Sequence, residues 1–234
     1  LAGCVQGENS GESAAAGGGE WSTDSLAIDW ATYNPLSLVV KDQGLLEEAL
    51  GDSVEVEWQQ SAGSNKANEL LRSGSIDVGS TAGSAALFAR SNGSPIQVID
   101  VYAQPEWSAI VVGPDSDITE VSQLAGASVA ATKGTDPYFF LVQALDEAGV
   151  DLNSVEVQNL QHADGRTALQ NGSADAWAGL DPLMASAEPE GANLFHRNVD
   201  LTTYSFLNAT ASFIAESPEL AQLAADTSDR ARAA

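Results

Sequence analysis

The sequence predicts an α/β protein of two similar lobes, each a mostly parallel sheet flanked by helices. Short apolar runs alternate with longer amphipathic runs along the chain, which is the pattern that βαβ units produce. The pattern starts again near residue 128. Each half also carries a related segment, Leu-Arg-Ser-Gly-Ser-Ile-Asp-Val at 71–78 and Leu-Gln-Asn-Gly-Ser-Ala-Asp-Ala at 169–176. Because both segments run from a helix end through a turn into a strand, they indicate two lobes of related design.

The individual elements follow from hydrophobic period and from turn residues. Val54, Val56 and Trp58 alternate with charged residues, which is typical of a half-buried strand. Pro35 suits the first turn of a helix, and Gly74 suits a helix end. In the first half we expect strands at 26–28, 54–58, 76–78, 96–102 and 109–112, and helices at 35–40, 66–72 and 83–89. In the second half we expect strands at 128–131, 155–160 and 174–178, and helices at 137–148, 166–170 and from Pro182.

The charge of the chain is strongly negative. It has 33 acidic residues against 9 basic ones, for a formal net charge of −24. Affinity for nucleic acid depends on Lys and Arg, and anionic lipid also attracts basic surfaces, so neither is an expected partner of the folded body. The charge is typical of a protein kept soluble and monomeric by its surface.

Residues that could support metal binding or covalent chemistry are scarce. The chain has one cysteine, Cys4, and two histidines, His162 and His196. A disulfide framework and a cysteine metal cluster are therefore excluded, and no catalytic constellation stands out. We expect a binding protein with no cofactor and no metal rather than an enzyme.

The first residues resemble the end of a bacterial lipoprotein signal. Leu1-Ala2-Gly3-Cys4 has the apolar, small, small, Cys order of a lipobox, and Gly, Ser, Ala and Glu dominate the residues that follow. We expect Cys4 to carry lipid, residues 5–23 to form a flexible tether, and the body to lie outside the cytoplasm at a membrane. The alternative is a chance tetrapeptide with a free thiol. No run approaches the roughly 18 apolar residues of a membrane span.

Several loops lead from an expected strand into a helix, where free backbone N–H groups favour polar or anionic ligands. These loops cover 32–35, 61–65, 80–84 and 133–137. The candidate ligand-binding residues are Tyr33, Asn34, Ser61, Thr81, Gly83, Ser84, Gly134, Thr135 and Asp136, with Tyr33, Trp107, Tyr138 and Trp177 as candidate aromatic walls. The alternative for each loop is helix capping alone.

Several segments, in order and spacing, resemble the solute-binding proteins of aliphatic sulfonate, taurine and nitrate ABC importers, a family with relatives that bind a thiamin pyrimidine precursor. The resemblance rests on Tyr33–Leu36 with Lys41–Glu47, Leu71–Gly79, Lys133–Thr135, Leu145–Val150, and Gly172–Trp177 with Asp181-Pro182. It implies a type II periplasmic-binding-protein fold that closes on a small ligand like a hinge and delivers it to a permease with its ATPase. It adds the region of Asp181 to the candidate site.

The resemblance also implies lobe boundaries and two departures. Residues 24–112 and 205–234 would form the first lobe, and 113–204 the second. The family continues into further helices, so we expect the C-terminal part of the first lobe to be incomplete. Asp136 stands where sulfonate-binding members place a small hydroxyl residue. In the cleft its carboxylate would repel a sulfonate or nitrate; as a helix cap it would leave the ligand undetermined.

Two other functions remain compatible with this sequence. A tethered sensor would present its liganded lobes to a signalling partner. A pyrimidine-synthesis type of enzyme on the same fold would need a reactive group in the cleft, for which the chain offers His162 and His196.

Overall fold

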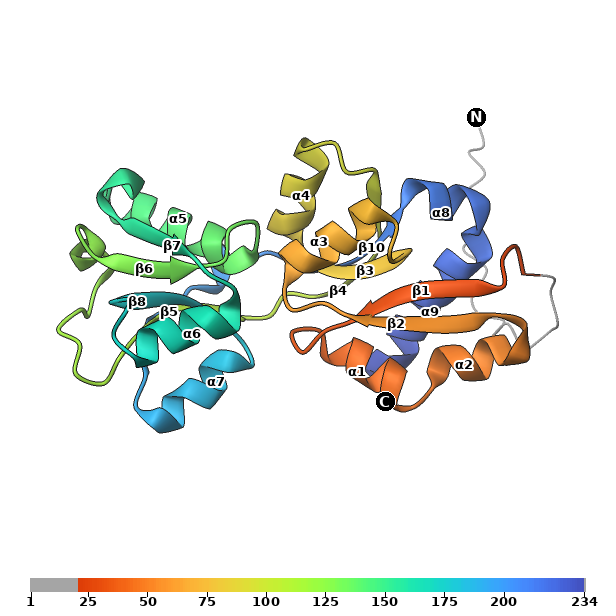
Figure 1. Cartoon of the computed structure of the whole chain (residues 1–234), viewed down its shortest axis with the longest axis horizontal. Helices are drawn as coiled ribbons and strands as arrows, with labels where there is room; N and C mark the ends of the chain where they lie inside the picture. The colour runs from red at the N-terminus through yellow and green to blue at the C-terminus, as the bar shows by residue number, and fades with distance from the viewer. Residues whose placement is uncertain (1–20, 234) are drawn as a thin grey trace, which may run out of the picture.

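The computed structural model describes residues 21–233 and contains two five-stranded sheets, one in each of two lobes that lie side by side (Figure 1). The first sheet has the order β2-β1-β3-β10-β4, with β1 Ser25–Trp30, β2 Glu55–Gln60, β3 Val78–Ala82, β4 Ile96–Ala103 and β10 Ser205–Thr210. The second has the order β7-β6-β8-β5-β9, with β5 Ser108–Val112, β6 Ser128–Ala131, β7 Glu156–Asn159, β8 Ala176–Leu180 and β9 Asn193–His196.

Strand direction follows the same scheme in both sheets. In the first, β2, β1 and β3 pair in parallel, and β10 runs antiparallel between β3 and β4. In the second, β7, β6 and β8 pair in parallel, and β5 runs antiparallel between β8 and β9. The prediction of two α/β lobes with mostly parallel sheets is confirmed.

Helices cover the sheets of both lobes (Figure 1). Those of the first lobe are α1 Pro35–Asp42, α2 Leu45–Leu50, α3 Ser64–Ser73, α4 Gly83–Ser91, α8 Ala211–Glu216 and α9 Pro218–Ala233. Those of the second are α5 Asp136–Glu147, α6 His162–Gln170 and α7 Leu183–Ala187. No helix within residues 21–233 is long and apolar enough to cross a membrane.

Two segments connect the lobes. Residues 104–107 lead from β4 to β5, and residues 197–204 lead back from β9 to β10. The Thr202 hydroxyl donates to the Pro105 carbonyl oxygen over 3.3 Å, so the two segments are bonded to each other. Because β5 pairs with β8 and β9, the first lobe ends before Ser108 and not at residue 112 as the sequence indicated. An apolar run such as Ser108–Val112 has no feature that tells which sheet it will join.

The related segments of the two halves, 71–78 and 169–176, make equivalent hydrogen bonds in the two lobes. The Asp77 carboxylate accepts from the Ala27 backbone N–H at 2.9 Å, and the Asp175 carboxylate accepts from the Ser128 N–H at 2.8 Å. Each bond joins the start of β3 or β8 to the neighbouring strand β1 or β6. The repeated Gly-Ser-x-Asp segment therefore places an Asp that bonds two neighbouring strands at the equivalent position of each lobe.

Both strands after these segments begin later than the sequence indicated. We expected strands at 76–78 and 174–178, whereas β3 spans Val78–Ala82 and β8 spans Ala176–Leu180. The residues Gly79-Ser80-Thr81 resemble a loop, but they lie fully buried in a central strand. Burial between helices on both faces overrides their weak strand propensity.

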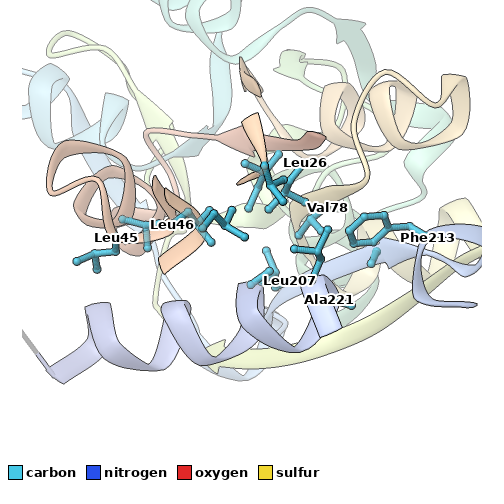
Figure 2. Close-up of a cluster of buried hydrophobic side chains, with 14 of the residues drawn as sticks. Leu26, Leu45, Leu46, Val78, Leu207, Phe213 and Ala221 are labelled. Atoms are coloured by element: carbon cyan, nitrogen blue, oxygen red, sulfur yellow. The ribbon is translucent and has the colours of Figure 1, made fainter. Parts of the chain in front are cut away.

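The core of the first lobe lies between its sheet and helices from the C-terminal part of the chain. Figure 2 shows Leu26, Val78 and Leu207 of the sheet converging with Phe213 of α8 and Ala221 of α9. The interior strand β10 and helices α8 and α9, which come from the C-terminal part of the chain, thus share one core with residues 25–82.

The folded body begins earlier than expected. The Ser22 backbone N–H donates to a Glu219 carboxylate oxygen at 3.0 Å, and the Ser22 hydroxyl donates to the Ser217 hydroxyl at 2.7 Å. Trp21 packs against the first core. Residues 21–23 are therefore docked on the first lobe and are not part of a tether. Cys4 and the rest of the expected tether lie outside the described residues.

Candidate functional site

The candidate site is the surface where the two lobes meet. Ala31, Tyr33, Ala82 and Ala85 of the first lobe form one buried cluster with Leu180 of the second lobe and with Trp107 of the first connecting segment. Beside this cluster, Phe88 of α4 and Phe139 of α5 approach with ring centroids 6.0 Å apart. Side chains from both lobes therefore close over a shared interior.

Asp136 lies at the centre of this surface, 2% exposed. Its Oδ1 accepts from the Ser84 hydroxyl at 2.6 Å and from the Thr203 hydroxyl at 2.6 Å. Its Oδ2 accepts from Trp107 Nε1–H at 2.7 Å and from the Thr203 backbone N–H at 3.1 Å. Ser84 belongs to the first lobe and Thr203 to a connecting segment, so the carboxylate bonds the lobes together.

The alternative of Asp136 as a helix cap is wrong. Thr135 is the N-cap residue of α5, and Asp136 is the first residue of the helix. The four hydrogen-bond donors of its carboxylate lie outside α5. The Asp136 side chain therefore faces the cleft, the position in which its carboxylate would repel a sulfonate or nitrate.

Four other candidate residues are bonded inside the first lobe. The Tyr33 hydroxyl donates to the Ser80 carbonyl oxygen at 2.9 Å, and Asn34 donates to the Ser80 hydroxyl at 2.7 Å while it caps α1. Asn208 donates to the Thr81 hydroxyl at 2.8 Å. Ser61 donates to a carboxylate oxygen of Asp29 at 2.7 Å. Asn34, Ser61 and Thr81 are thereby held as part of the lobe's own buried network, while the ring of Tyr33 reaches the shared cluster.

Asp29 is the buried charge in that network. Its carboxylate also accepts from the backbone N–H and the hydroxyl of Ser80, both at 2.9 Å. Burial raises the pKa of Asp29 to about 6, although the bonds from Ser61 and Ser80 oppose the rise. The strand expected at 26–28 ended before Asp29, which the sequence did not single out, whereas β1 extends to Trp30.

A very small cavity remains in the closed cleft. It has a volume of about 10 Å³, and its lining includes Tyr33, Trp107, Thr135, Asp136 and His162. Such a volume holds about one water molecule, so a ligand reaches this place only when the lobes separate.

His162 is a cleft residue that the sequence analysis set aside. Its Nδ1 lies 3.2 Å from the Thr132 hydroxyl, and its buried Nε2 has no hydrogen-bond partner within residues 21–233. Burial lowers the pKa of His162 to about 4, so the imidazole is neutral near pH 7. Thr203 was missed, because nothing in its local sequence indicates that a distant residue will contact it.

Two larger grooves flank the closed centre. One, of about 670 Å³, lies between α3 and α4 and the second lobe, and its lining includes Lys66, Arg72, Lys133 and Gly134. The other, of about 430 Å³, is lined by Tyr33, Trp107 and Asp181 among others. Each groove draws residues from both lobes.

The remaining candidates are placed as follows. The Gly83 backbone N–H donates to the Tyr204 carbonyl oxygen at 2.8 Å, which fixes the start of α4 beside the second connecting segment. Asp181 lies 3.9 Å from Arg197 and accepts from the Ala185 N–H, so it is partly engaged outside the centre. Tyr138 packs against the core of the second lobe, and Trp177 is buried in that lobe, away from the cleft.

Metal binding has no support within residues 21–233, where no three His, Cys, Asp or Glu side chains are placed to hold an ion. The site offers hydroxyls, amides, an indole and a neutral imidazole around one carboxylate. Such groups can bind and orient a small polar molecule by hydrogen bonds and by contact with aromatic rings.

Comparison with known proteins agrees with this geometry. Residues 39–233 match the family model described as NMT1/THI5 like. An Escherichia coli (strain K12) protein named as an aliphatic sulfonates-binding protein is 32% identical over 173 residues, which cover 74% of this chain and 54% of that protein. A Bacillus subtilis (strain 168) protein of the same name is 26% identical over 193 residues, covering 80% of this chain and 58% of that protein. The chain spans about half the length of the curated relatives it matches.

Solved structures show the same fold. The alkanesulfonate-binding protein SsuA from Xanthomonas axonopodis pv. citri, bound to MOPS, has a TM-score of 0.84 at 24% identity, with 89% of this chain and 73% of that chain covered. The periplasmic aliphatic sulphonate binding protein SsuA from Escherichia coli has a TM-score of 0.76 at 29% identity, with 89% and 72% covered. The family resemblance drawn from the sequence is confirmed. The chain belongs to the NMT1/THI5-like family.

Proposed function

We propose that this protein is the solute-binding component of an ABC importer, which captures a small polar molecule between its two lobes outside the cytoplasm. The observation that carries the proposal is the shared interior of the lobes, where Tyr33 and Ser84 of the first lobe face Asp136 of the second lobe and Trp107 of the first connecting segment. Relatives named for sulfonate binding and for periplasmic binding in ABC transport support it.

Capture requires the lobes to separate and close again. The two connecting segments are the only covalent links between the sheets within residues 21–233, and they lie side by side, bonded through Thr202 and Pro105. A rotation about this pair would break contacts between the lobes that include the Ser84–Asp136 bond, the Phe88–Phe139 contact and the shared cluster. Closure buries the ligand and converts its polar contacts into binding energy in a site that excludes water.

The partners and location of the whole protein follow from this role. A permease with its ATPase would receive the ligand, and lipid on Cys4 would hold the folded body near that permease. The expected form is a monomer, in line with a net charge of −24 that opposes self-association.

A thermal-shift screen of the purified chain tests the proposal. The panel contains taurine, alkanesulfonates, nitrate, bicarbonate, aminopyrimidines and small amines and amides. A ligand at about a hundred times its dissociation constant adds about 2.7 kcal/mol to the free energy of unfolding. No stabilisation by any member of the panel would contradict the proposal.

Two tryptophans supply matched variants for that screen. Trp107 Nε1–H donates to Asp136 inside the cleft at 2.7 Å, and Trp58 Nε1–H donates to Glu47 outside it at 2.8 Å. Trp107→Phe should weaken the binding of any ligand found, and Trp58→Phe should leave it unchanged. Equal losses in both variants would place the ligand elsewhere.

A further inference from the structure

The Asp136 carboxylate is bound as a ligand would be. Ser84 and Thr203 hydroxyls meet at Oδ1, and the Trp107 indole N–H and the Thr203 backbone N–H meet at Oδ2. A carboxylate has about four acceptor positions, so all of them are filled. The arrangement is that of a site for an oxyanion, with donors converging on two oxygens from several directions.

The donors are positioned without help from Asp136. The Ser84 backbone N–H donates to the Thr203 hydroxyl oxygen at 3.1 Å, and the Gly83 N–H donates to the Tyr204 carbonyl oxygen at 2.8 Å. These bonds join the start of α4 to the second connecting segment. The Trp107 ring is fixed by the shared apolar cluster. The four donors therefore form a preformed oxyanion seat, which we define by Ser84, Trp107 and Thr203.

The seat binds negative charge through neutral dipoles. Within residues 21–233 Asp136 takes part in no ion pair, although its carboxylate is 2% exposed. The nine-residue helix α4 begins at Gly83, and Ser84 of the seat is its second residue, so the positive end of the helix dipole lies at the seat. Polar groups and a helix start thus offset the cost of burying one anion there.

We propose that Asp136 is a specificity-determining residue, a tethered anion that fills the oxyanion seat between the lobes and excludes ligands whose own oxyanion must bind there. The inference rests on the proposed function only in placing the ligand between the lobes. A sulfonate or nitrate would have to displace a covalently attached competitor, whose effective concentration is high. It would also leave the displaced carboxylate in the closing cleft without its donors, which is unfavourable for a buried charge.

Removal of the carboxylate should turn the seat into a binding site for free anions. Asp136→Ala deletes a group of the size and charge of formate and keeps the four donors. We expect formate to bind this variant about a hundredfold more tightly than it binds the wild type, because the vacated donors bond a charged group. Nitrate and methanesulfonate should also raise the unfolding temperature of Asp136→Ala, with chloride at equal concentration as the control for ionic strength.

Two further variants make the experiment specific. Asp29 is also buried and accepts hydrogen bonds from Ser61 and Ser80, but its network lies inside one lobe. Asp29→Ala should lose stability without gaining affinity for methanesulfonate, which has no route to that position. Asp136→Ala combined with Thr203→Val should lose the response to formate, because half of the donors to Oδ1 disappear.

Circular dichroism first establishes that each variant is folded, and Asp136→Ser replaces Asp136→Ala if the latter is not. No response of the folded variant to formate, nitrate or methanesulfonate would overturn the inference. So would tight binding of a sulfonate or nitrate by the wild type, an outcome that would leave the proposed function intact. A panel without any ligand, together with rescue of Asp136→Ala by formate, would reject the proposed function and keep the seat.

Discussion

Replacement of Asp29 by Asn should stabilise the protein near neutral pH. Burial raises the pKa of the Asp29 carboxyl from its ordinary value of 3.8 to about 6. Asn keeps the contact with both donors of Ser80 and can donate to Ser61 in place of accepting from it. The variant therefore retains the shape and most of the bonds of the site and removes the cost of burying a charge.

The pH dependence gives the sign and the size of the effect. Because the folded pKa lies above the unfolded value, the folded state binds more protons, and stability is lost as the pH rises toward the folded pKa. Relative to a side chain that stays neutral, Asp29 lowers the free energy of unfolding by about 1 kcal/mol at pH 4.5, where it is ionised mainly in the unfolded chain, and by about 3 kcal/mol at pH 7.5, where it is ionised in both states. The advantage of Asp29→Asn should therefore grow by about 2 kcal/mol across this range.

Urea unfolding of both proteins at the two pH values measures this difference. Asp175→Asn is the control, because hydrogen bonds from the Ser128 backbone and hydroxyl lower the pKa of the exposed Asp175 carboxyl. That shift has the opposite sign, so wild-type stability from Asp175 is present at neutral pH and is lost in acid. If the difference in the free energy of unfolding between Asp29→Asn and the wild type stays constant or shrinks as the pH rises, burial of a charged Asp29 carboxylate is contradicted.

Three further predictions concern the cleft and the cores. Burial lowers the pKa of His162 from 6.5 to about 4, so the wild type should lose stability as the pH falls through this range. His162→Gln lacks this titrating group, so its free energy of unfolding should fall less than that of the wild type between pH 7 and pH 4.5. Gly179→Ala should cost about 1–3 kcal/mol by overpacking, because a Cβ there would lie 2.6 Å from Met184 Cγ, while Gly113→Ala, which has open space, should cost almost nothing in the same urea titration. Phe213→Ala should cost about 3–5 kcal/mol, since its ring is 6% exposed and fills the first core, and a loss below about 1 kcal/mol would contradict that packing.

The fold was largely predictable from local pattern. The alternation of apolar and amphipathic runs gave two α/β halves, and Gly74 ends its helix with a φ of 71°, where glycine avoids the penalty of a side chain. The limits of β3 and β8 were not predictable, because Gly79-Ser80-Thr81 becomes strand only when helices bury both faces. The sheet that β5 joins depends equally on tertiary contacts.

The sequence indicated which loops could form the candidate site, but it did not indicate which of their side chains would bond to one another. Hydroxyl and glycine residues at helix starts, where backbone N–H groups are free, made Ser84 and Asp136 candidates, and the structure brings these two side chains together. Thr203 was missed, and His162 was considered only for an enzyme, because their places in the cleft arise from segments that are far apart in sequence. The Ser84 and Thr203 hydroxyls lie 52 and 67 residues from Asp136, and no local period connects them.

Closure of the lobes around a ligand is measured most directly by the distance between the two lobes. Spin labels can be placed at Leu87→Cys on α4, where the native side chain is 71% exposed, and at Glu147→Cys at the end of α5, with Cys4→Ser to remove the native thiol. We predict that a ligand from the panel narrows the distribution of label-to-label distances to one short separation. In the free protein, Ser84→Ala should broaden that distribution. Ligand binding that leaves the distances of both proteins unchanged would contradict capture by closure.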